Sequence, residues 1–167
     1  MTSPSQEHFQ PKNKQRNLSL ELEKLNLCFS AAHFLVGFGK CEYLHGHNYQ
    51  VTLKVTADFR PDQEALIDFS LLKRKVSKII NKLDHRILLA ERHPKIQIHF
   101  ENDHVTARSE ENRYTFPASD TVLLPIPATT CEHLAFYLLD QIKKAFPEFK
   151  LEISVEETPG SKAVVSE

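Results

Sequence analysis

Three histidines in the N-terminal half of the chain have the spacing expected of a metal site. His45 and His47 stand on either side of a glycine and begin a run, continuing to Val55, in which every second residue is apolar or aromatic. Side chains at alternate positions of a strand point to the same side, so the pattern predicts two inward-facing imidazoles. His33 shares the parity of the apolar residues in segment 27–31, which predicts that it faces inward as well.

If the strands that carry these histidines pair as a hairpin, the three imidazoles converge at its end. Three histidines with an open fourth position is the arrangement of a catalytic zinc site, and we favour it over three hydrogen-bonded core histidines. Gly46, between two of the histidines, permits a close approach of backbone or ligand.

Cys41 lies four residues before His45, in a glycine-containing loop between the two predicted strands. A thiol near a divalent cation has its pKa lowered and is a thiolate at neutral pH. Cys41 could therefore act as a general base, or as a fourth metal ligand that closes the site, and the spacing leaves both open. Cys131 falls in the first turn of a predicted helix, where packing is the simpler interpretation.

Two acidic groups offer further chemistry. Asp84 precedes His85, and a neighbouring carboxylate can fix the tautomer of an imidazole and raise its basicity. The alternative is a helix C-terminus, where His85 and Arg86 would interact with the helix dipole. Glu156 has the polar parity of the last predicted strand, and the pattern alone makes it an exposed glutamate.

The elements that must position these residues follow from hydrophobic periodicity. We predict a strand over 18–31 with a one-residue slip near 23–24, a strand over 45–56, and a helix over 70–83 capped by Asp68 or Ser70. A capping box at 129–132 begins a second helix that ends before Pro147, and a last strand covers 149–155. This order predicts an α+β fold, an antiparallel sheet with two helices packed on one face.

Length and composition favour a single cytoplasmic domain. The chain has 167 residues, a net charge of -1 and three cysteines. The chain lacks the overall positive charge that would indicate nucleic-acid binding. No apolar run reaches the ~20 residues needed to span a membrane, and the three cysteines do not predict a disulfide framework. We predict a disordered tail over 1–17 and one domain over 18–167, with an inserted hairpin near 95–125.

Several segments together resemble the 6-pyruvoyl-tetrahydropterin and 6-carboxy-tetrahydropterin synthases of the tunnelling fold (T-fold). They occur in the family's order: FSAAH (29–33), C-x3-HGHNY (41–49), IDF (67–69), LDHR (83–86), TTCEHLA (129–135) and VEET (155–158). The resemblance implies trimers that stack as homo-hexamers, with 7,8-dihydroneopterin triphosphate bound between subunits.

The resemblance also implies roles for individual residues. His33, His45 and His47 match the Zn²⁺ ligands, and Cys41 matches the catalytic base. Asp84 and His85 match the proton relay, Glu156 the carboxylate that anchors the pterin, and Thr130 and Cys131 positions that line the pterin pocket.

Two products occur in this family. One branch releases 6-carboxy-tetrahydropterin with acetaldehyde and triphosphate for queuosine synthesis, and the other releases 6-pyruvoyl-tetrahydropterin for biopterin synthesis. The three-residue gap between Cys41 and His45 favours the first. Glu42 is relevant because some relatives replace the cysteine with a glutamate and release a different pterin. The rival classes are a non-catalytic zinc module and a metal-free thiol hydrolase that uses Cys41, His85 and Asp84.

Overall fold

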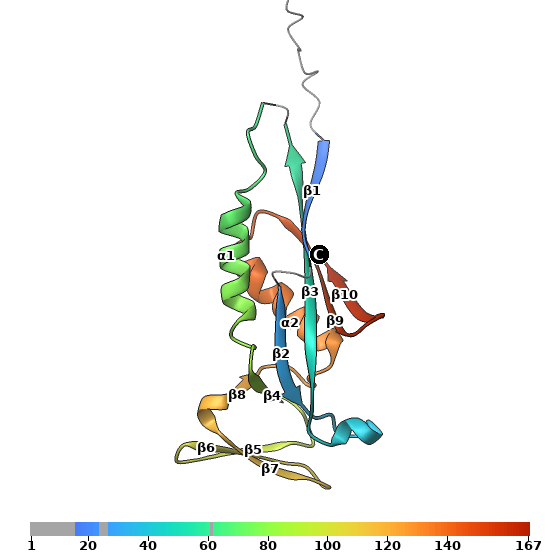
Figure 1. Ribbon diagram of the computed structural model, residues 1–167, viewed down its shortest axis with the longest axis vertical. Coiled ribbons are helices and arrows are strands. Elements are labelled where there is room, and N and C mark those ends of the chain that lie inside the picture. The colour runs from blue at the N-terminus through green and yellow to red at the C-terminus, as the bar shows by residue number, and fades with distance from the viewer. Residues whose placement is uncertain (1–15, 24–26, 61) are drawn as a thin grey trace, which may run out of the picture.

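The computed structural model describes residues 16–23, 27–60 and 62–167, which form two β-sheets and two α-helices (Figure 1). The larger sheet has seven strands, six in the order β10-β9-β3-β2-β4-β8, with β1 also paired to β3. Its strands are β1 (Arg16–Leu22), β2 (Cys28–His33), β3 (His45–Phe59), β4 (Arg86–Ala90), β8 (Thr121–Leu124), β9 (Lys150–Thr158) and β10 (Ser161–Ser166). The pairs β2–β4 and β4–β8 are parallel, and the other pairs of this sheet are antiparallel.

The long strand β3 is the centre of this sheet. It pairs with β9 along one edge, and with β2 and then β1 along the other. The sequence predicted one slipped strand over 18–31, whereas β1 and β2 are separate. Leu22 lies opposite Leu53 while Cys28 lies opposite Gln50, so the chain between β1 and β2 is longer than the part of β3 that it passes. Residues 24–26, which include part of the predicted slip, lie outside the described residues.

The two helices pack their apolar stripes into one core with the inward side chains of the large sheet, as predicted. In α1 (Phe69–Ile80) the Asp68 carboxylate caps the first turn by accepting a 2.7 Å hydrogen bond from the Ser70 amide. In α2 (Cys131–Ala145) the buried stripe repeats at helical spacing. The core residues from these elements are Phe29, Tyr49, Val51, Leu53, Val55, Leu72, Val76, Ile80, Leu134, Leu138, Ile142, Leu151, Ile153 and Val155. The α+β class is therefore confirmed.

The region predicted as an inserted hairpin is a separate three-stranded antiparallel sheet followed by β8. Its strands are β5 (Gln97–Glu101), β6 (His104–Arg108) and β7 (Arg113–Pro117), and they lie at the lower end of the molecule in Figure 1. This inserted sheet has a small core of its own, formed by Phe34, Leu89, Val105, Ala107 and Phe116. Its position next to the β2–β3 connection matters for the site described below.

Three strands of the large sheet were absent from the prediction: β4, β8 and β10. β4 and β8 are short apolar runs, in which period two cannot be recognised because both faces are covered. β1 begins at Arg16, so residues 16 and 17 are strand rather than tail, and residues 1–15 lie outside the described residues.

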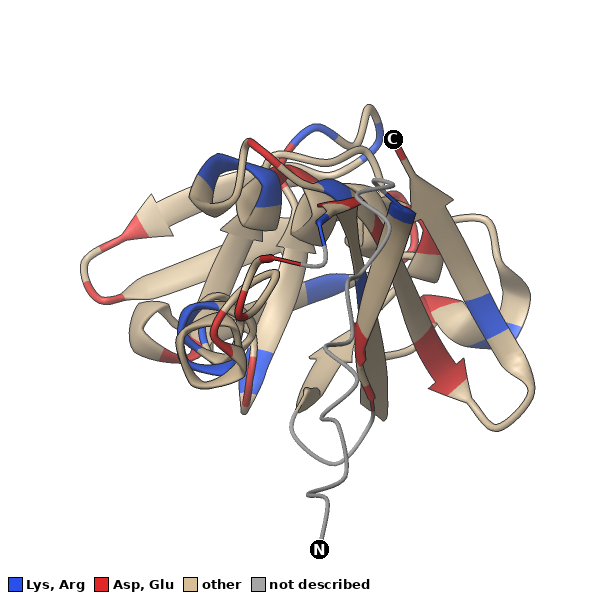
Figure 2. Ribbon diagram, turned by 90° about the horizontal axis from the view of Figure 1, so that it is seen from above, with Lys and Arg blue, Asp and Glu red and all other residues tan. Residues whose placement is uncertain are grey.

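None of the helices in the described part of the chain has the length and apolarity needed to cross a bilayer. Seen from above, basic and acidic residues are interspersed over the helices and strands (Figure 2).

Candidate metal centre

The pairing of β2 with β3 brings the three predicted histidines together. His33 lies directly opposite His45, and His47 lies opposite Ala31, so all three side chains project from the same face. The ring centroids are 4.6 Å apart for His33 and His45, 5.0 Å for His45 and His47, and 5.3 Å for His33 and His47. A fourth group, the Glu157 carboxylate, joins them, and the candidate ligand atoms of all four residues lie within 4.8 Å of one another.

Backbone carbonyls orient two of the imidazoles. Nδ1 of His33 donates a 2.9 Å hydrogen bond to the carbonyl of Thr129, and Nδ1 of His45 donates a 2.7 Å bond to the carbonyl of Tyr43. A carbonyl only accepts, so Nδ1 carries the proton and Nε2 keeps its lone pair. Both rings therefore present an unprotonated nitrogen to the centre of the cluster, which is how metal-ligating histidines are held.

The nitrogen atoms that face the cluster are suited to a metal ion. Nε2 of His45 and Nε2 of His47 are buried and form no hydrogen bond, although the latter lies 2.8 Å from a Glu157 oxygen. A buried polar atom without a partner is costly, and a cation would satisfy both nitrogens at once. Three imidazoles and a nearby carboxylate are also a donor set that Zn²⁺ accepts. The residues present fit a divalent metal.

Burial keeps the imidazoles of His33 and His47 neutral. The pKa of His33 falls to about 4, first because the ring is removed from water and then because it faces His45, while the Glu157 carboxylate opposes the shift. The pKa of His47 is also lowered, mainly because burial removes its ring from water. A neutral imidazole is the form that binds a metal, so the site is prepared for one at neutral pH.

Tyr49 lies behind the cluster as a neutral hydrogen-bond donor. Its hydroxyl is 3.4 Å from Nε2 of His33, and burial raises the pKa of the phenol. The ring stacks on Phe29 at a centroid distance of 4.7 Å, and both side chains are buried. This stack packs the interior directly beneath the histidines.

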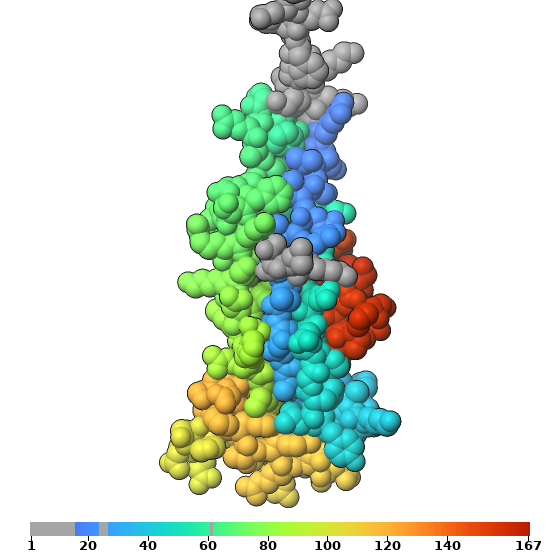
Figure 3. Space-filling model, viewed as in Figure 1, coloured from blue at the N-terminus to red at the C-terminus, as the bar shows by residue number. Residues whose placement is uncertain are grey.

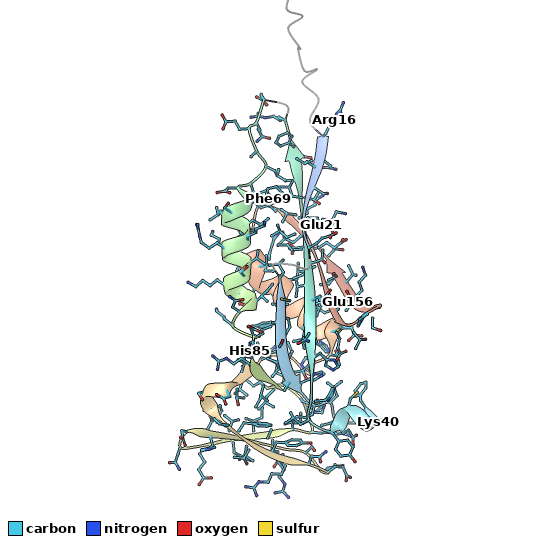
Figure 4. All side chains as sticks on the ribbon, in the orientation of Figure 1. Arg16, Glu21, Lys40, Phe69, His85 and Glu156 are labelled. Atoms are coloured by element: carbon cyan, nitrogen blue, oxygen red, sulfur yellow. The ribbon has the colours of Figure 1, made fainter. Side chains whose placement is uncertain are left out.

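The carboxylate at the cluster is Glu157, the neighbour of Glu156, which the resemblance implies as the pterin anchor. Glu157 Oε1 lies 3.4 Å from Nε2 of His33. The other Glu157 oxygen accepts a 3.7 Å hydrogen bond from the Cys131 thiol, whose pKa rises to about 12 through burial and this negative charge. Glu156 instead accepts a 2.9 Å bond from the Gly160 amide in the β9–β10 turn. Figure 4 shows Glu156 on β9.

A signal in the sequence could have identified Glu157. It has the odd parity of the buried residues Leu151, Ile153 and Val155, the same argument that placed His33 inward. Parity gave Glu156 the exposed side of this strand, and the same alternation puts the next residue, Glu157, on the buried side.

Thr129 is a second residue that the sequence analysis missed. The predicted capping box placed it at the N-cap of the second helix, but the N-cap is Thr130 and its side chain makes no capping bond. Thr129 is 1% exposed, and its hydroxyl lies 3.1 Å from Nδ1 of His33, beside the carbonyl that receives the proton. Thr129 therefore orients the His33 ring and does not cap the helix.

Asp84 and His85 form the expected dyad, on the other side of the sheet. Nδ1 of His85 lies 2.9 Å from one Asp84 oxygen, and the Ser30 amide donates a 2.8 Å bond to the other. These contacts, the Ser30 bond first, lower the pKa of Asp84. The His85 side chain is 84% exposed and has a positive φ of 55°. Because α1 already ends at Ile80, the helix-dipole interpretation does not apply.

The dyad faces away from the histidine cluster. His85 lines an open groove of about 470 Å³. Ser30, Ala32 and Asn48, whose parity is opposite to that of His33 and His47, line it too, and Ala31 and His47 also contribute to its wall. Ser30 and Asn48 are joined across this face by a 2.6 Å hydrogen bond. Figure 4 shows His85 near the neighbouring strands β2 and β4. Within one chain, the sheet separates the dyad from the metal cluster.

Cys41 lies in the loop between β2 and β3, on the short 3-10 helix η1 (Gly39–Glu42). Its thiol is free and half-buried. The four-residue group of candidate ligands contains Glu157 rather than Cys41.

Comparison with known proteins gives relatives along most of the chain. The family model described as 6-pyruvoyl tetrahydropterin synthase matches residues 24–167. A Methanocaldococcus jannaschii protein named putative 6-carboxy-5,6,7,8-tetrahydropterin synthase is 35% identical over 127 residues, 75% of this chain and 78% of that protein. A solved Plasmodium vivax 6-pyruvoyltetrahydropterin synthase with a catalytic-residue mutation matches with a TM-score of 0.83 at 32% identity, covering 91% of this chain and 98% of that one. The Plasmodium falciparum enzyme matches with a TM-score of 0.81 at 34% identity, covering 90% and 98%.

The low pKa of His33 predicts an acid-sensitive metal-free protein. The unfolded state takes up a proton near pH 6.5 and the folded state only near pH 4, so stability falls as the pH drops through this window. Between pH 7 and pH 5 the free energy of unfolding should decrease by about 2 kcal/mol, measured by urea denaturation after removal of metal with a chelator. His33→Gln removes the titrating ring and should reduce this dependence. Equal pH dependence in both proteins contradicts the assignment.

Proposed function

The chain belongs to the 6-pyruvoyl tetrahydropterin synthase family, and we propose that it is a zinc-dependent lyase acting on 7,8-dihydroneopterin triphosphate. Its products are 6-carboxy-5,6,7,8-tetrahydropterin, acetaldehyde and triphosphate. The observation that carries the proposal is the convergence of His33, His45 and His47 with the Glu157 carboxylate, whose candidate ligand atoms all lie within 4.8 Å of one another. The Methanocaldococcus jannaschii and Bacillus subtilis relatives, named as 6-carboxy-tetrahydropterin synthases, support this product.

His33, His45 and His47 would hold the Zn²⁺ through their Nε2 atoms. When bound, the metal supplies Lewis-acid polarisation of a substrate oxygen. The carbonyls of Thr129 and Tyr43 keep two of these rings in the metal-binding tautomer, so the protein holds their geometry before any ion arrives.

Glu157 anchors the pterin in this proposal. A carboxylate can accept two parallel N–H bonds from the planar guanidine-like edge of a pterin, which fixes both position and orientation. Glu157 lies between the histidine cluster and Cys131, a residue expected to line the pterin pocket, with Thr130 beside it in the chain. A pterin bound there would have its side chain close to the metal.

Cys41, Asp84 and His85 move protons. Cys41 acts as the base near the metal, and Asp84 fixes the proton on Nδ1 of His85, so that Nε2 can accept or donate one. The dyad lies on the opposite face of the sheet from the cluster, so we propose that it completes the site of a neighbouring subunit. This arrangement requires an assembly, which we propose to be a cytoplasmic homo-hexamer made of two trimers.

The alternative product is 6-pyruvoyl-tetrahydropterin. It is favoured by the names of the Plasmodium structures, and the residue mutated in the Plasmodium vivax structure is a glutamate. Glu42, next to Cys41, here accepts a 2.7 Å bond from the Gly37 amide. A non-catalytic zinc module is disfavoured, because Glu157 and the dyad would have no function in it.

The proposal is tested by incubating the zinc-loaded protein with 7,8-dihydroneopterin triphosphate. We expect 6-carboxy-tetrahydropterin, separated by chromatography, with an equal amount of acetaldehyde in a coupled assay. A 6-pyruvoyl product without acetaldehyde would establish the alternative. No consumption of the substrate would contradict both reactions.

Replacement of Cys41 separates a catalytic from a structural thiol. Cys41→Ala should keep its zinc, because the histidines hold the metal, whereas turnover should fall by about a hundredfold or more with the loss of the base. Zinc is measured by elemental analysis and turnover by product formation. Cys28→Ala is the control, since that thiol is exposed and lies at the other end of β2, and it should leave both values unchanged. Loss of zinc in Cys41→Ala would make the thiol a ligand.

The two neighbouring glutamates give a matched pair of variants. Glu157→Gln keeps size but loses a charged acceptor, so the KM for the pterin should rise by about ten- to a hundredfold. Glu156→Gln changes a side chain that accepts from the β9–β10 turn, and its KM should remain near that of the unmodified protein. A larger effect of Glu156→Gln would return the anchoring role to that residue.

A further inference from the structure

The loop that carries Cys41 is closed upon itself by short hydrogen bonds. The Leu35 amide donates to the carbonyl of Cys41 at 2.8 Å, and the Gly37 amide donates to the Glu42 carboxylate at 2.7 Å. Gly37 has a positive φ of 86°, a conformation that a residue with a side chain rarely adopts. The loop is therefore an ordered unit that can be held or moved as a whole.

The inserted sheet contacts this loop at the residue next to Cys41. The Tyr114 hydroxyl donates to the Glu42 carbonyl at 3.3 Å, and the Asn112 amide nitrogen donates to the same oxygen at 3.4 Å. Asn112 is itself held in a tight turn, because its carbonyl accepts a 2.8 Å bond from the Ser109 amide. Two donors from an element some seventy residues away in the chain converge on one carbonyl of the loop.

Apolar packing fixes the inserted sheet to the start of the same loop. Phe34 directly follows the predicted metal ligand His33 and belongs to the core of the inserted sheet with Val105 and Phe116. Its ring lies 4.9 Å from the ring of Tyr114. In the space-filling view, the inserted sheet and the loop form one continuous end of the molecule (Figure 3). The sheet thus holds the loop at its beginning and beside Cys41.

We propose that the inserted sheet β5–β7 is a brace for the Cys41 loop, and that Tyr114 and Asn112 are positioning residues for the Cys41 thiol. The effect on catalysis rests on the proposed function, whereas the effect on the thiol's position does not. Neither residue touches the histidine cluster, so the brace sets where the thiol lies and leaves the metal and pterin contacts alone. Displacing a catalytic group by about 1 Å can lower the rate by about a hundredfold.

The test compares a Tyr114→Phe/Asn112→Ala double variant with a Thr115→Val control, both as zinc-loaded full-length chains. Tyr114→Phe keeps the ring on Phe34 and removes only the hydroxyl. Thr115 lies on the same strand and is exposed, and its hydroxyl bonds to Thr106 at 2.9 Å within the inserted sheet. In the double variant kcat should fall by about tenfold with KM and zinc content unchanged. The control should match the unmodified protein.

A second readout does not need the enzymatic activity. The rate at which iodoacetamide alkylates Cys41, followed by mass spectrometry of its peptide, should rise several-fold in the double variant and not in Thr115→Val. Tyr114→Phe alone, the more conservative change, should shift the rate in the same direction if the double variant folds poorly. Unchanged alkylation overturns the brace whether or not the pterin is consumed. Faster alkylation with an unchanged kcat overturns the positioning role in catalysis.

Discussion

The antiparallel register of β2 and β3, in which His33 lies opposite His45, fixes the place of all three imidazoles. A shift by one residue would turn one histidine-bearing strand's side chains to the opposite face and disperse the cluster. The stack of Phe29 on Tyr49 on the buried face holds this register. The close approach of the two strands also requires a glycine at position 46, because a Cβ there would lie 3.0 Å from the Ala31 carbonyl oxygen. The metal site therefore depends on packing along the whole strand pair.

The cluster is an unfavourable arrangement for a protein without a metal. The Nε2 atoms of His45 and His47 are buried without a hydrogen bond. Burial lowers the pKa of His33 and of His47, so a proton does not easily take the place of a cation at these two rings. The fold tolerates this because the surrounding core is extensive and because carbonyls satisfy the outward-facing nitrogens of two rings. Occupation by a divalent cation would turn the same atoms into a stabilising contribution.

The sheet divides the proposed chemistry between its two faces. The metal cluster and Glu157 occupy the face shared with the helices, and the Asp84–His85 dyad occupies the opposite groove. The dyad is anchored by the Ser30 backbone while its His85 side chain is largely exposed, which is why we propose that it serves a neighbouring subunit. The inserted sheet adds a third component, since it bonds to the carbonyl of Glu42, the residue next to Cys41. The metal cluster, the dyad and the Cys41 loop are thus each held in place by contacts with a different part of the structure.

The sequence alone determined what depends on local periodicity. The alternation of β3 placed His45 and His47 on one face, and helical spacing identified the buried stripes of both helices, because side-chain direction follows directly from strand or helix geometry. The same alternation puts Glu157 on the buried side of β9 and Glu156 on the other side. The predicted roles of the metal, thiol and dyad residues stay predictions.

Only the tertiary structure decided which distant segments meet. The carbonyl of Thr129 reaches His33 across 96 residues, the short apolar runs of β4 and β8 become parallel strands, and Asp84 bonds to the Ser30 backbone. The expected hairpin became a three-stranded sheet that contacts the Cys41 loop. Such pairings depend on which surface is left uncovered when the rest of the chain has folded. The periodicity of a short segment cannot predict these pairings, because the position of the segment it pairs with depends on how the whole core packs.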